Sequence, residues 1–323
     1  MIRYILKRLL MMIPVLLGVM FVVFTIMHIT PGDPARMILG EGASAEAVEE
    51  LREELGLNDP FLVQLARYIK QVVFELDLGE SYSSKKPVMD ELLARFPTTL
   101  TLAVLSVLIS VVIGVPLGIL SAAKPYSILD NIATAIALFG VSMPTFWAGL
   151  MAVIIFSVTL GLLPASGSYG PEYWVLPSAV LGFHSAARIM RMTRSSMLEV
   201  IRQDYIRTAR AKGQKEWVVI TVHALKNAMI PVLTVIGMQF GTLLGGSVLI
   251  ESVFALPGLG NYIIDSIKTR DNPVVQGGVL MLALAFSFVN LFVDILYGYI
   301  DPRIKSQYKL PKRRSAAKHA KEK

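Results

Sequence analysis

The sequence predicts an all-α polytopic membrane protein with six transmembrane helices, and two observations predict it: composition and hydropathy patterning. Hydrophobic residues make up 54% of the 323 residues and charged residues only 17%, and the mean hydropathy is +0.58. The apolar residues gather in long runs, and a helix needs about 20 largely apolar residues to cross a bilayer. Six runs are candidate spans: Leu9–Ile29, Leu100–Ala122, Ile132–Leu162, Trp174–Ile189, Met229–Ile250 and Gly277–Ile300.

Basic residues before the first run indicate its orientation. Arg3, Lys7 and Arg8 precede it and no small-residue cleavage site follows, so residues 1–29 are expected to be a cytoplasmic N-terminus and a retained first span, not a signal peptide. With that start inside, most of the 31 lysines and arginines fall on cytoplasmic segments, and both termini are predicted to be cytoplasmic. The net charge of +7 then reflects cationic faces against anionic lipid and a cytoplasmic partner, and nucleic acid is not required.

The segment 30–99, between the first two runs, is predicted to be a small helical extracytoplasmic domain. Ser44 can cap a helix that continues to Leu55 and stops at Gly56, and Asp59-Pro60 can start a second helix. The remaining chain is expected to form a five-span core and a basic, disordered cytoplasmic tail, over residues 100–300 and 301–323.

Within the core, the cytoplasmic connection 190–228 is the segment where contact with another protein is expected. Asp204 can cap a short helix from Tyr205 to Lys212, and Gly213 can end it in the left-handed conformation. This helix would present a small-residue surface with a cationic rim: Thr208, Ala209 and Ala211, flanked by Arg207 and Arg210. Such a surface suits docking into a groove of a partner. The alternative is an amphipathic helix on the membrane surface, although residues 206–215 contain no Phe, Trp or Leu.

This connection also carries a resemblance to a known family. The run DYIRTARAKG at 204–213, followed by HALKNAMIPV at 223–232, resembles the cytoplasmic EAA loop of ABC-transporter permeases, most closely the dipeptide/oligopeptide/nickel importers. The usual Glu-Ala-Ala appears as Arg207-Thr208-Ala209, which is common in the peptide branch. Further motifs agree along nearly the whole chain, in order: TPGDPA at 30–35, ELGLNDP at 54–60, DLGES at 77–81, PTTL at 97–100, SMPTFW at 142–147, GLLPASG at 161–167, LGGSVLIESVFALPGLG at 244–260 and DPR at 301–303.

The resemblance implies a type I ABC-importer-like permease in the cell (inner) membrane of a bacterium or archaeon. Such a subunit pairs with a second homologous permease, expected to give a heterodimer, and works with two ATPase subunits and an extracytoplasmic substrate-binding protein. The cargo would be dipeptides or oligopeptides, with nickel, glutathione or another small solute as the alternative. ATP and Mg would bind the ATPase subunits and no cofactor would bind this chain. The coupling helix to the ATPase would comprise Asp204, Tyr205, Arg207, Thr208, Ala209, Arg210, Ala211 and Gly213.

The residues themselves do not favour an enzyme. The chain has no phosphate-binding G-x-x-x-x-G-K-[ST] loop and no G-x-S-x-G elbow, and its four histidines lack metal-ligand spacing. No catalytic or metal residues are therefore predicted. An ion-coupled secondary transporter is the alternative from another class.

Polar residues in and near the spans are candidates for the transport path. Ser142, Gln239, Thr242 and Ser247 could line it, although the glycines around the last three equally suit tight helix packing. Glu251, at the outer mouth, could form an outer gate, contact the binding protein or be an ordinary solvated acid.

Asp294 is the acidic residue placed inside a predicted span, and Asn290 lies one turn earlier on the same face. A charge at a helix centre costs about 2.5–3.5 kcal/mol, so such residues usually face protein or water. We expect a structural hydrogen-bonding pair near the cytoplasmic end that reaches a residue of the Arg188–Arg194 stretch. A substrate or proton site is the alternative.

Overall fold

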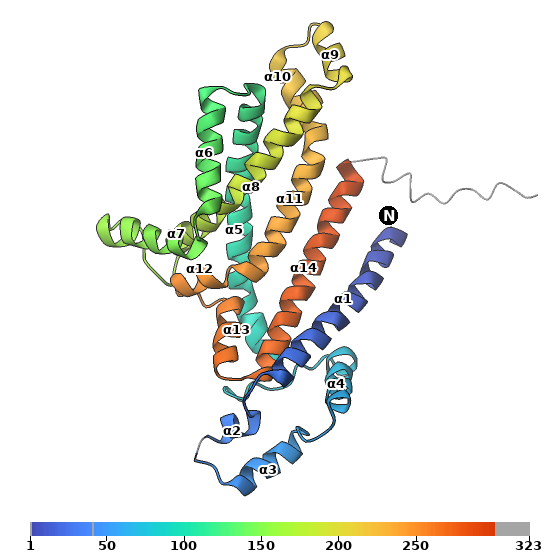
Figure 1. Cartoon of the computed structure of the whole chain (residues 1–323), viewed down its shortest axis with the longest axis vertical. Helices are drawn as coiled ribbons and strands as arrows, with labels where there is room; N and C mark the ends of the chain where they lie inside the picture. The colour runs from blue at the N-terminus through green and yellow to red at the C-terminus, as the bar shows by residue number, and fades with distance from the viewer. Residues whose placement is uncertain (1, 41, 301–323) are drawn as a thin grey trace, which may run out of the picture.

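The computed structural model of the chain describes residues 2–40 and 42–300, and the predicted tail 301–323 lies outside the described residues. Long helices dominate the described part (Figure 1): α1 (Ile2–Ile29), α5 (Val88–Ala123), α8 (Val175–Ile201), α11 (Leu225–Gly246) and α14 (Asn272–Ile300). Shorter helices connect them: α2 (Pro34–Leu39), α3 (Ala45–Glu54), α4 (Phe61–Lys70), α6 (Ile128–Ser142), α7 (Thr145–Ala152), α9 (Asp204–Ala211), α10 (Glu216–Val218), α12 (Val248–Val253) and α13 (Leu259–Lys268). Three π-helical segments and one 3-10 turn complete the list: η1 (Gln71–Glu75), η2 (Val153–Thr159), η4 (Val219–Ala224) and η3 (Pro171–Trp174). The all-α prediction is confirmed, since the described residues form no strand beyond one isolated bridge between Glu80 and Pro87.

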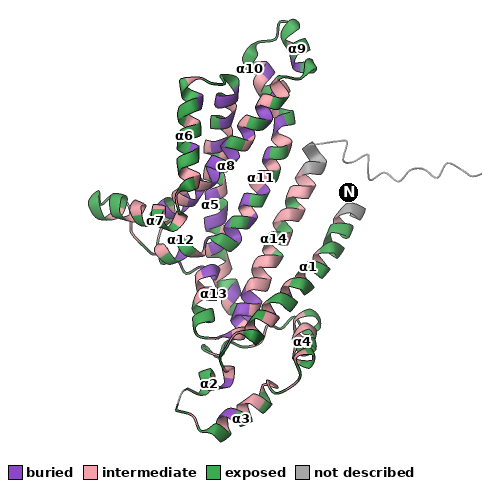
Figure 2. Ribbon diagram, in the orientation of Figure 1, coloured by how far each residue is buried: buried purple, intermediate pink, exposed green. Residues whose placement is uncertain are grey.

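Helices α5 and α8 pack along each other and form the centre of the molecule, where buried residues concentrate (Figure 2). Small residues permit this approach. A Cβ at Gly114 of α5 would lie 2.7 Å from the carbonyl oxygen of Ala186, and one at Gly118 would lie 2.5 Å from Cβ of Thr193. The two backbones are therefore in direct contact along the middle of both helices.

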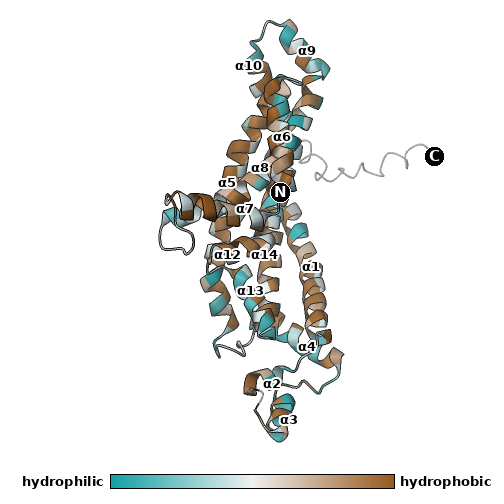
Figure 3. Ribbon diagram, turned by 60° about the vertical axis from the view of Figure 1, so that its left-hand side comes forward, coloured by the Kyte–Doolittle hydropathy of each residue, from teal (hydrophilic) through white to brown (hydrophobic). Residues whose placement is uncertain are grey.

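Helix α1 lies apart from this centre and packs against α14. Most of its described side chains are exposed or half-buried (Figure 2), and its surface is strongly apolar (Figure 3). An exposed apolar helix of this length fits a lipid or partner surface better than water.

The span count differs from the prediction. Among the described residues, four helices are long and apolar enough to cross a membrane, over Ile5–Ile29, Val88–Ala123, Glu216–Gly246 and Asn272–Leu296, and α6 with the segment Thr145–Thr159 would make a fifth. Helix α8 is not among them, since its arginines, His184 and serines lower the hydropathy of this helix.

The predicted third span, Ile132–Leu162, is not one straight helix. Its two halves are bent by 101° at a short break. The break follows from Pro144, which lacks an amide hydrogen and disfavours a helical residue before it, and Met143 is indeed extended with φ −80° and ψ 128°. The chain thus turns a sharp corner at Ser142-Met143-Pro144.

The segment between α1 and α5 forms the end of the molecule opposite α9 (Figure 1). Both of its predicted helices are confirmed. The Ser44 hydroxyl caps α3 by accepting from the Ala47 amide at 3.2 Å, and Gly56, just past the end of that helix, has φ +63°. Helix α4 begins directly after Pro60.

Candidate functional site

Helix α9, the predicted coupling helix, projects at one end of the molecule (Figure 1). The helix ends at Ala211, one residue before the predicted Lys212, and the predicted stop is confirmed, since Gly213 has φ +76°, which favours glycine. Its start is different, since Gln203 takes the cap position and Asp204 is the first helical residue. The Asp204 side chain is 98% exposed and its carboxylate lies 3.7 Å from the Arg207 guanidinium, one turn on.

One fully buried side chain attaches this helix to its neighbours. Ile206 is fully buried among small and aliphatic residues of α5, α8, η4 and α11: Ala122, Met197, Val219, Ala224 and Ala228. The Tyr205 hydroxyl adds one hydrogen bond, accepted from the Asn227 amide at 2.7 Å. Ile206 was not among the predicted coupling residues. Its signal was present, as an isolated large aliphatic residue within a polar helix.

The packing around Ile206 covers part of the predicted small-residue surface and leaves the rest exposed. Ala209 lies one turn from Ile206 and packs partly against the same cluster, whereas Thr208 and Ala211 are exposed. Arg207 is also exposed. The free face of α9 thus consists of small and charged side chains, as a docking surface requires.

The turn after α9 is held by an ion pair. Arg210 donates to both carboxylate oxygens of Glu216, at 3.0 and 2.6 Å, across Gly213. Glu216 begins α10, which continues through the π-helical η4 into α11 as one stretch from Glu216 to Gly246. π-Helical turns often occur at functional sites. The turn after α9 therefore leads directly into a membrane-length helix.

The four candidate path residues are not brought together. Gln239 is buried and accepts a hydrogen bond from Arg188 at 3.1 Å, and Ser247 is buried beside Glu251. Ser142 and Thr242 are exposed, and each hydroxyl donates to a backbone carbonyl one turn back in its own helix.

Glu251 is completely buried, which contradicts its interpretation as a solvated acid or a direct contact for a binding protein. Its carboxylate accepts from the hydroxyls of Thr99 at 2.8 Å and Ser247 at 2.9 Å, and from the Asn261 amide at 2.9 Å. Gly258 makes room for it, because a Cβ there would lie 2.3 Å from the carboxyl carbon. The acid and the glycine within the motif LIESVFALPGLG are thus parts of one packed junction between α5, α12 and α13.

Asp294 pairs with Arg8 of α1 at 3.0 Å, so the expectation that it reaches the Arg188–Arg194 stretch is wrong. From that stretch, Arg194 forms a salt bridge: it donates to both oxygens of Asp130 on α6, at 2.6 and 2.7 Å. Asn290 precedes Asp294 by one helical turn on α14. The sequence could not reveal the Arg8 partner, since the pairing depends on α1 lying against α14.

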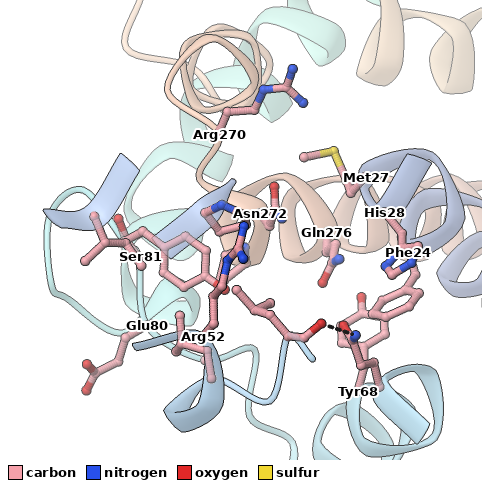
Figure 4. A pocket seen from close by; sticks show the side chains of 18 of the residues that line it. Phe24, Met27, His28, Arg52, Tyr68, Glu80, Ser81, Arg270, Asn272 and Gln276 are labelled. Atoms are coloured by element: carbon pink, nitrogen blue, oxygen red, sulfur yellow. Dashed lines mark hydrogen bonds between the residues drawn. The ribbon is translucent and has the colours of Figure 1, made fainter. Parts of the chain in front are cut away.

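A cavity of about 810 Å³ lies at the end of the molecule opposite α9 (Figure 4). Its walls come from the end of α1, the segment between α1 and α5, and the start of α14, and they include His28, Arg52, Tyr68, Arg270 and Gln276. Burial raises the pKa of Tyr68 to about 12, so this phenol is neutral at physiological pH. The cavity carries charges of both signs and suits a polar ligand or an inserted loop better than an apolar one.

Buried Asp271 fixes one wall of this cavity. Its carboxylate accepts from the Ser81 hydroxyl at 2.5 Å and from the Tyr82 and Ser83 amides at 3.0 and 3.1 Å. Burial, aided by the charge of Asp271, raises the pKa of Tyr82 to about 12. Neither Asp271 nor the cavity was predicted, because both arise where residues about 190 positions apart meet.

Among the described residues no group of three or more His, Cys, Asp or Glu side chains could hold a metal ion. The described residues place a projecting helix, α9, next to long apolar helices, with a polar cavity at the far end.

Comparison with known proteins agrees with this arrangement. The family model described as the inner membrane component of binding-protein-dependent transport systems matches residues 114–306, and the model of its N-terminal part matches residues 1–103. The chain is 47% identical to the dipeptide transport system permease protein DppB of Alkalihalophilus pseudofirmus, over 94% of this chain and 100% of that protein. It is 44% identical to the DppB of Escherichia coli K12, over 94% and 99%.

A solved structure shares the fold. A chain of the MetNI methionine ABC transporter, in an inward-facing conformation, aligns with a TM-score of 0.57 at 22% identity, over 67% of this chain and 99% of that one. The chain is a multi-pass membrane protein, and it belongs to the family of binding-protein-dependent transport system inner membrane components.

Proposed function

We propose that this chain is the permease subunit of an ATP-driven peptide importer and forms the translocation path together with a second, homologous permease. Support comes from relatives named dipeptide permeases that match along nearly the whole chain. Two ATPase subunits bind at the α9 end and carry ATP and Mg, and a substrate-binding protein delivers peptides at the opposite end. This chain binds no cofactor itself.

The proposed topology has six spans with both termini in the cytoplasm. The bent pair α6 and α7–η2 serves as the third span and α8 as the fourth, with the segment between α1 and α5 outside the cell. In this arrangement the arginines of α8 face protein or water, not lipid, as intramembrane charges generally do. Glu251 would then hold the outer mouth by joining α5, α12 and α13, and would take part in gating through this junction.

One observation carries the coupling role: α9 presents an exposed small and charged face, yet is seated by Ile206 on helices that continue into the membrane. ATP-driven closure of the ATPase pair would displace α9, and α10, η4 and α11 would transmit that displacement. The coupling residues are Asp204, Tyr205, Arg207, Thr208, Ala209, Arg210, Ala211 and Gly213, with Ile206 as their anchor.

The test is uptake and ATP hydrolysis by the complete complex in vesicles, with Gly213→Trp or Ala209→Trp in this chain. Bulk at either position is expected to leave ATP hydrolysis running while peptide uptake falls about tenfold or more. Lys215→Gln, an exposed substitution just after the turn, is the control. Normal uptake and assembly in Gly213→Trp would contradict the coupling role.

Three further outcomes separate the alternatives. Uptake by this chain alone, without ATP or partners, would indicate an ion-coupled secondary transporter. Asp294→Asn is expected to retain ATP-dependent uptake, because its partner is the structural Arg8. Uptake of nickel or glutathione but not of peptides by the complete complex would reassign the cargo.

A further inference from the structure

Helix α8 carries a polar stripe on the face turned away from α5. His184, Arg188, Arg191 and Ser195 follow one another at spacings of four, three and four residues, which places them on one side of a helix. The two arginines and Ser195 are exposed and His184 is half-buried, whereas Ser185, Ile189 and Thr193 on the other side are buried. This stripe was not among the predicted path residues.

The charges of this helix are unequally compensated. Arg194 is neutralised by the buried Asp130 of α6. Arg188 contacts only the neutral amide of Gln239, and within residues 2–40 and 42–300 no carboxylate pairs with Arg188 or Arg191. The acid on the same face, Glu199, lies eight residues beyond Arg191, roughly 12 Å along the helix. The stripe therefore presents two uncompensated positive charges.

Contacts between α8 and α5 indicate how deep Arg188 lies in the membrane. Gly114 of α5 lies against Ala186 and Ile189, the neighbours of Arg188. Gly114 is eight residues, roughly 12 Å, from the end of the apolar run at Ala122. Arg188 is thus level with the interior of an apolar span. A cation facing hydrocarbon there would cost about 2.5–3.5 kcal/mol, so this face adjoins water or protein.

Gln239 prepares Arg188 to bind an anion. The side-chain amide oxygen of Gln239 accepts a hydrogen bond from Nη1 of Arg188, with 3.1 Å between the two atoms. Gln239 is itself buried against α8. One guanidinium has five N–H donors, so the contact fixes its orientation and leaves a pair of donors free. A guanidinium fork binds a carboxylate through two parallel hydrogen bonds, which an ammonium group cannot do.

We propose that Arg188, oriented by Gln239, and Arg191 form an anion site in the translocation path that binds the C-terminal carboxylate of the peptide. The proposal rests on the proposed function and specifies its substrate class: peptides with a free carboxylate. Such a site gives the permease its own selection step, separate from that of the binding protein.

The experiment uses the complete complex in vesicles, with its binding protein, and compares uptake of radiolabelled dialanine with that of dialanine amide. The binding protein is identical in every sample, so a change in the acid-to-amide ratio reports on the permease. Arg188→Gln and Arg191→Gln are expected to lower dialanine uptake about tenfold, the loss of a charge-assisted hydrogen-bond pair, and to change amide uptake less than about twofold. Arg188→Lys should recover part of the dialanine uptake, since it restores the charge without the fork.

The control is Lys124→Gln, which removes an exposed positive charge at the end of α5 and should leave the ratio unchanged. ATP hydrolysis stimulated by the binding protein should persist in all variants, since α9 is untouched. An unchanged ratio in both arginine variants would overturn the proposal. So would loss of the second permease from the complex in Arg188→Gln, because the arginine would then pair with an acid of that subunit. A wild-type complex that imports neither compound would contradict the proposed peptide function instead.

Discussion

The two ends of this molecule are attached to the central helices in different ways. At the end opposite α9, two buried carboxylates, Asp271 and Glu251, each accept three hydrogen bonds from neighbouring elements. At the α9 end, the buried side chain of Ile206, partial packing of Ala209 and one neutral hydrogen bond from Asn227 to Tyr205 hold the helix, and an exposed ion pair, Arg210 with Glu216, holds the turn after it.

This difference bears on which end can move. Hydrogen bonds to a buried carboxylate are directional, and a displacement leaves donors unpaired in a dry environment. Apolar packing is not directional, so a seated side chain tolerates small translations. The end opposite α9 is therefore built to hold its geometry and the α9 end to be displaced, as the proposed coupling role of α9 requires.

Asp271→Ala should have the largest effect on stability. It removes the acceptor of three buried hydrogen bonds and leaves the Ser81, Tyr82 and Ser83 donors without it, at a cost of about 3–5 kcal/mol. Thermal unfolding in detergent should shift markedly downward, and residues 79–87 should become sensitive to protease. Asp265→Ala removes an exposed carboxylate from the same region and is the control. Equal stability of the two variants would refute a rigid attachment at this end.

Glu251 and Gly258 allow a sharper test of the same end. Gly258→Ala alone should destabilise the protein by about 1–3 kcal/mol, since the new methyl group would lie 2.3 Å from the Glu251 carboxyl carbon. In Glu251→Ala the space is vacant, so adding Gly258→Ala should cost much less. A double-mutant cycle of unfolding midpoints measures the difference, and additive effects would show that the two residues do not share this space.

Ile206→Ala tests the other side of the comparison. Loss of a buried aliphatic side chain costs about 2–4 kcal/mol, but here the loss is confined to the seat of α9. We expect uptake to fall strongly while the global unfolding midpoint changes little. Leu198→Ala, which truncates a half-buried residue packed against the same cluster, is the control. A large global destabilisation without loss of coupling would show that Ile206 belongs to the core of the protein and is not a local anchor for α9.

These contrasts also mark what the sequence could reveal. Local signals were sufficient where local chemistry decides: the cap at Ser44, the stops at Gly56 and Gly213, and the break before Pro144 all follow from neighbouring residues. Contacts between distant segments were not accessible. Asp271 with Ser81, Asp294 with Arg8 and Glu251 with Thr99 join positions 152 to 286 residues apart. A hydropathy pattern identifies the helices but does not determine which of them pack together.

Gly213→Ala should have a smaller effect than Ile206→Ala. A Cβ at Gly213 meets no atom within 4 Å, so its cost is the strain of φ +76°, about 1 kcal/mol. Coupling should weaken only slightly, in contrast to Gly213→Trp, whose bulk would project into the docking surface. The ratio of uptake to ATP hydrolysis distinguishes strain from obstruction, and equal uncoupling by both variants would show that backbone geometry alone matters.

Arg210→Ala should have the smallest effect. Its ion pair with Glu216 is well aligned, but the two side chains are 39% and 55% exposed, and exposed pairs contribute about 0.2–1 kcal/mol. We expect the unfolding midpoint to stay unchanged and the uptake-to-hydrolysis ratio to fall slightly, more at low salt than at high salt, since screening already weakens the pair in the wild type. Glu216→Gln should reproduce the result if the pair only steadies the turn at Gly213. A much larger loss in Arg210→Ala than in Glu216→Gln would show instead that Arg210 contacts the ATPase directly.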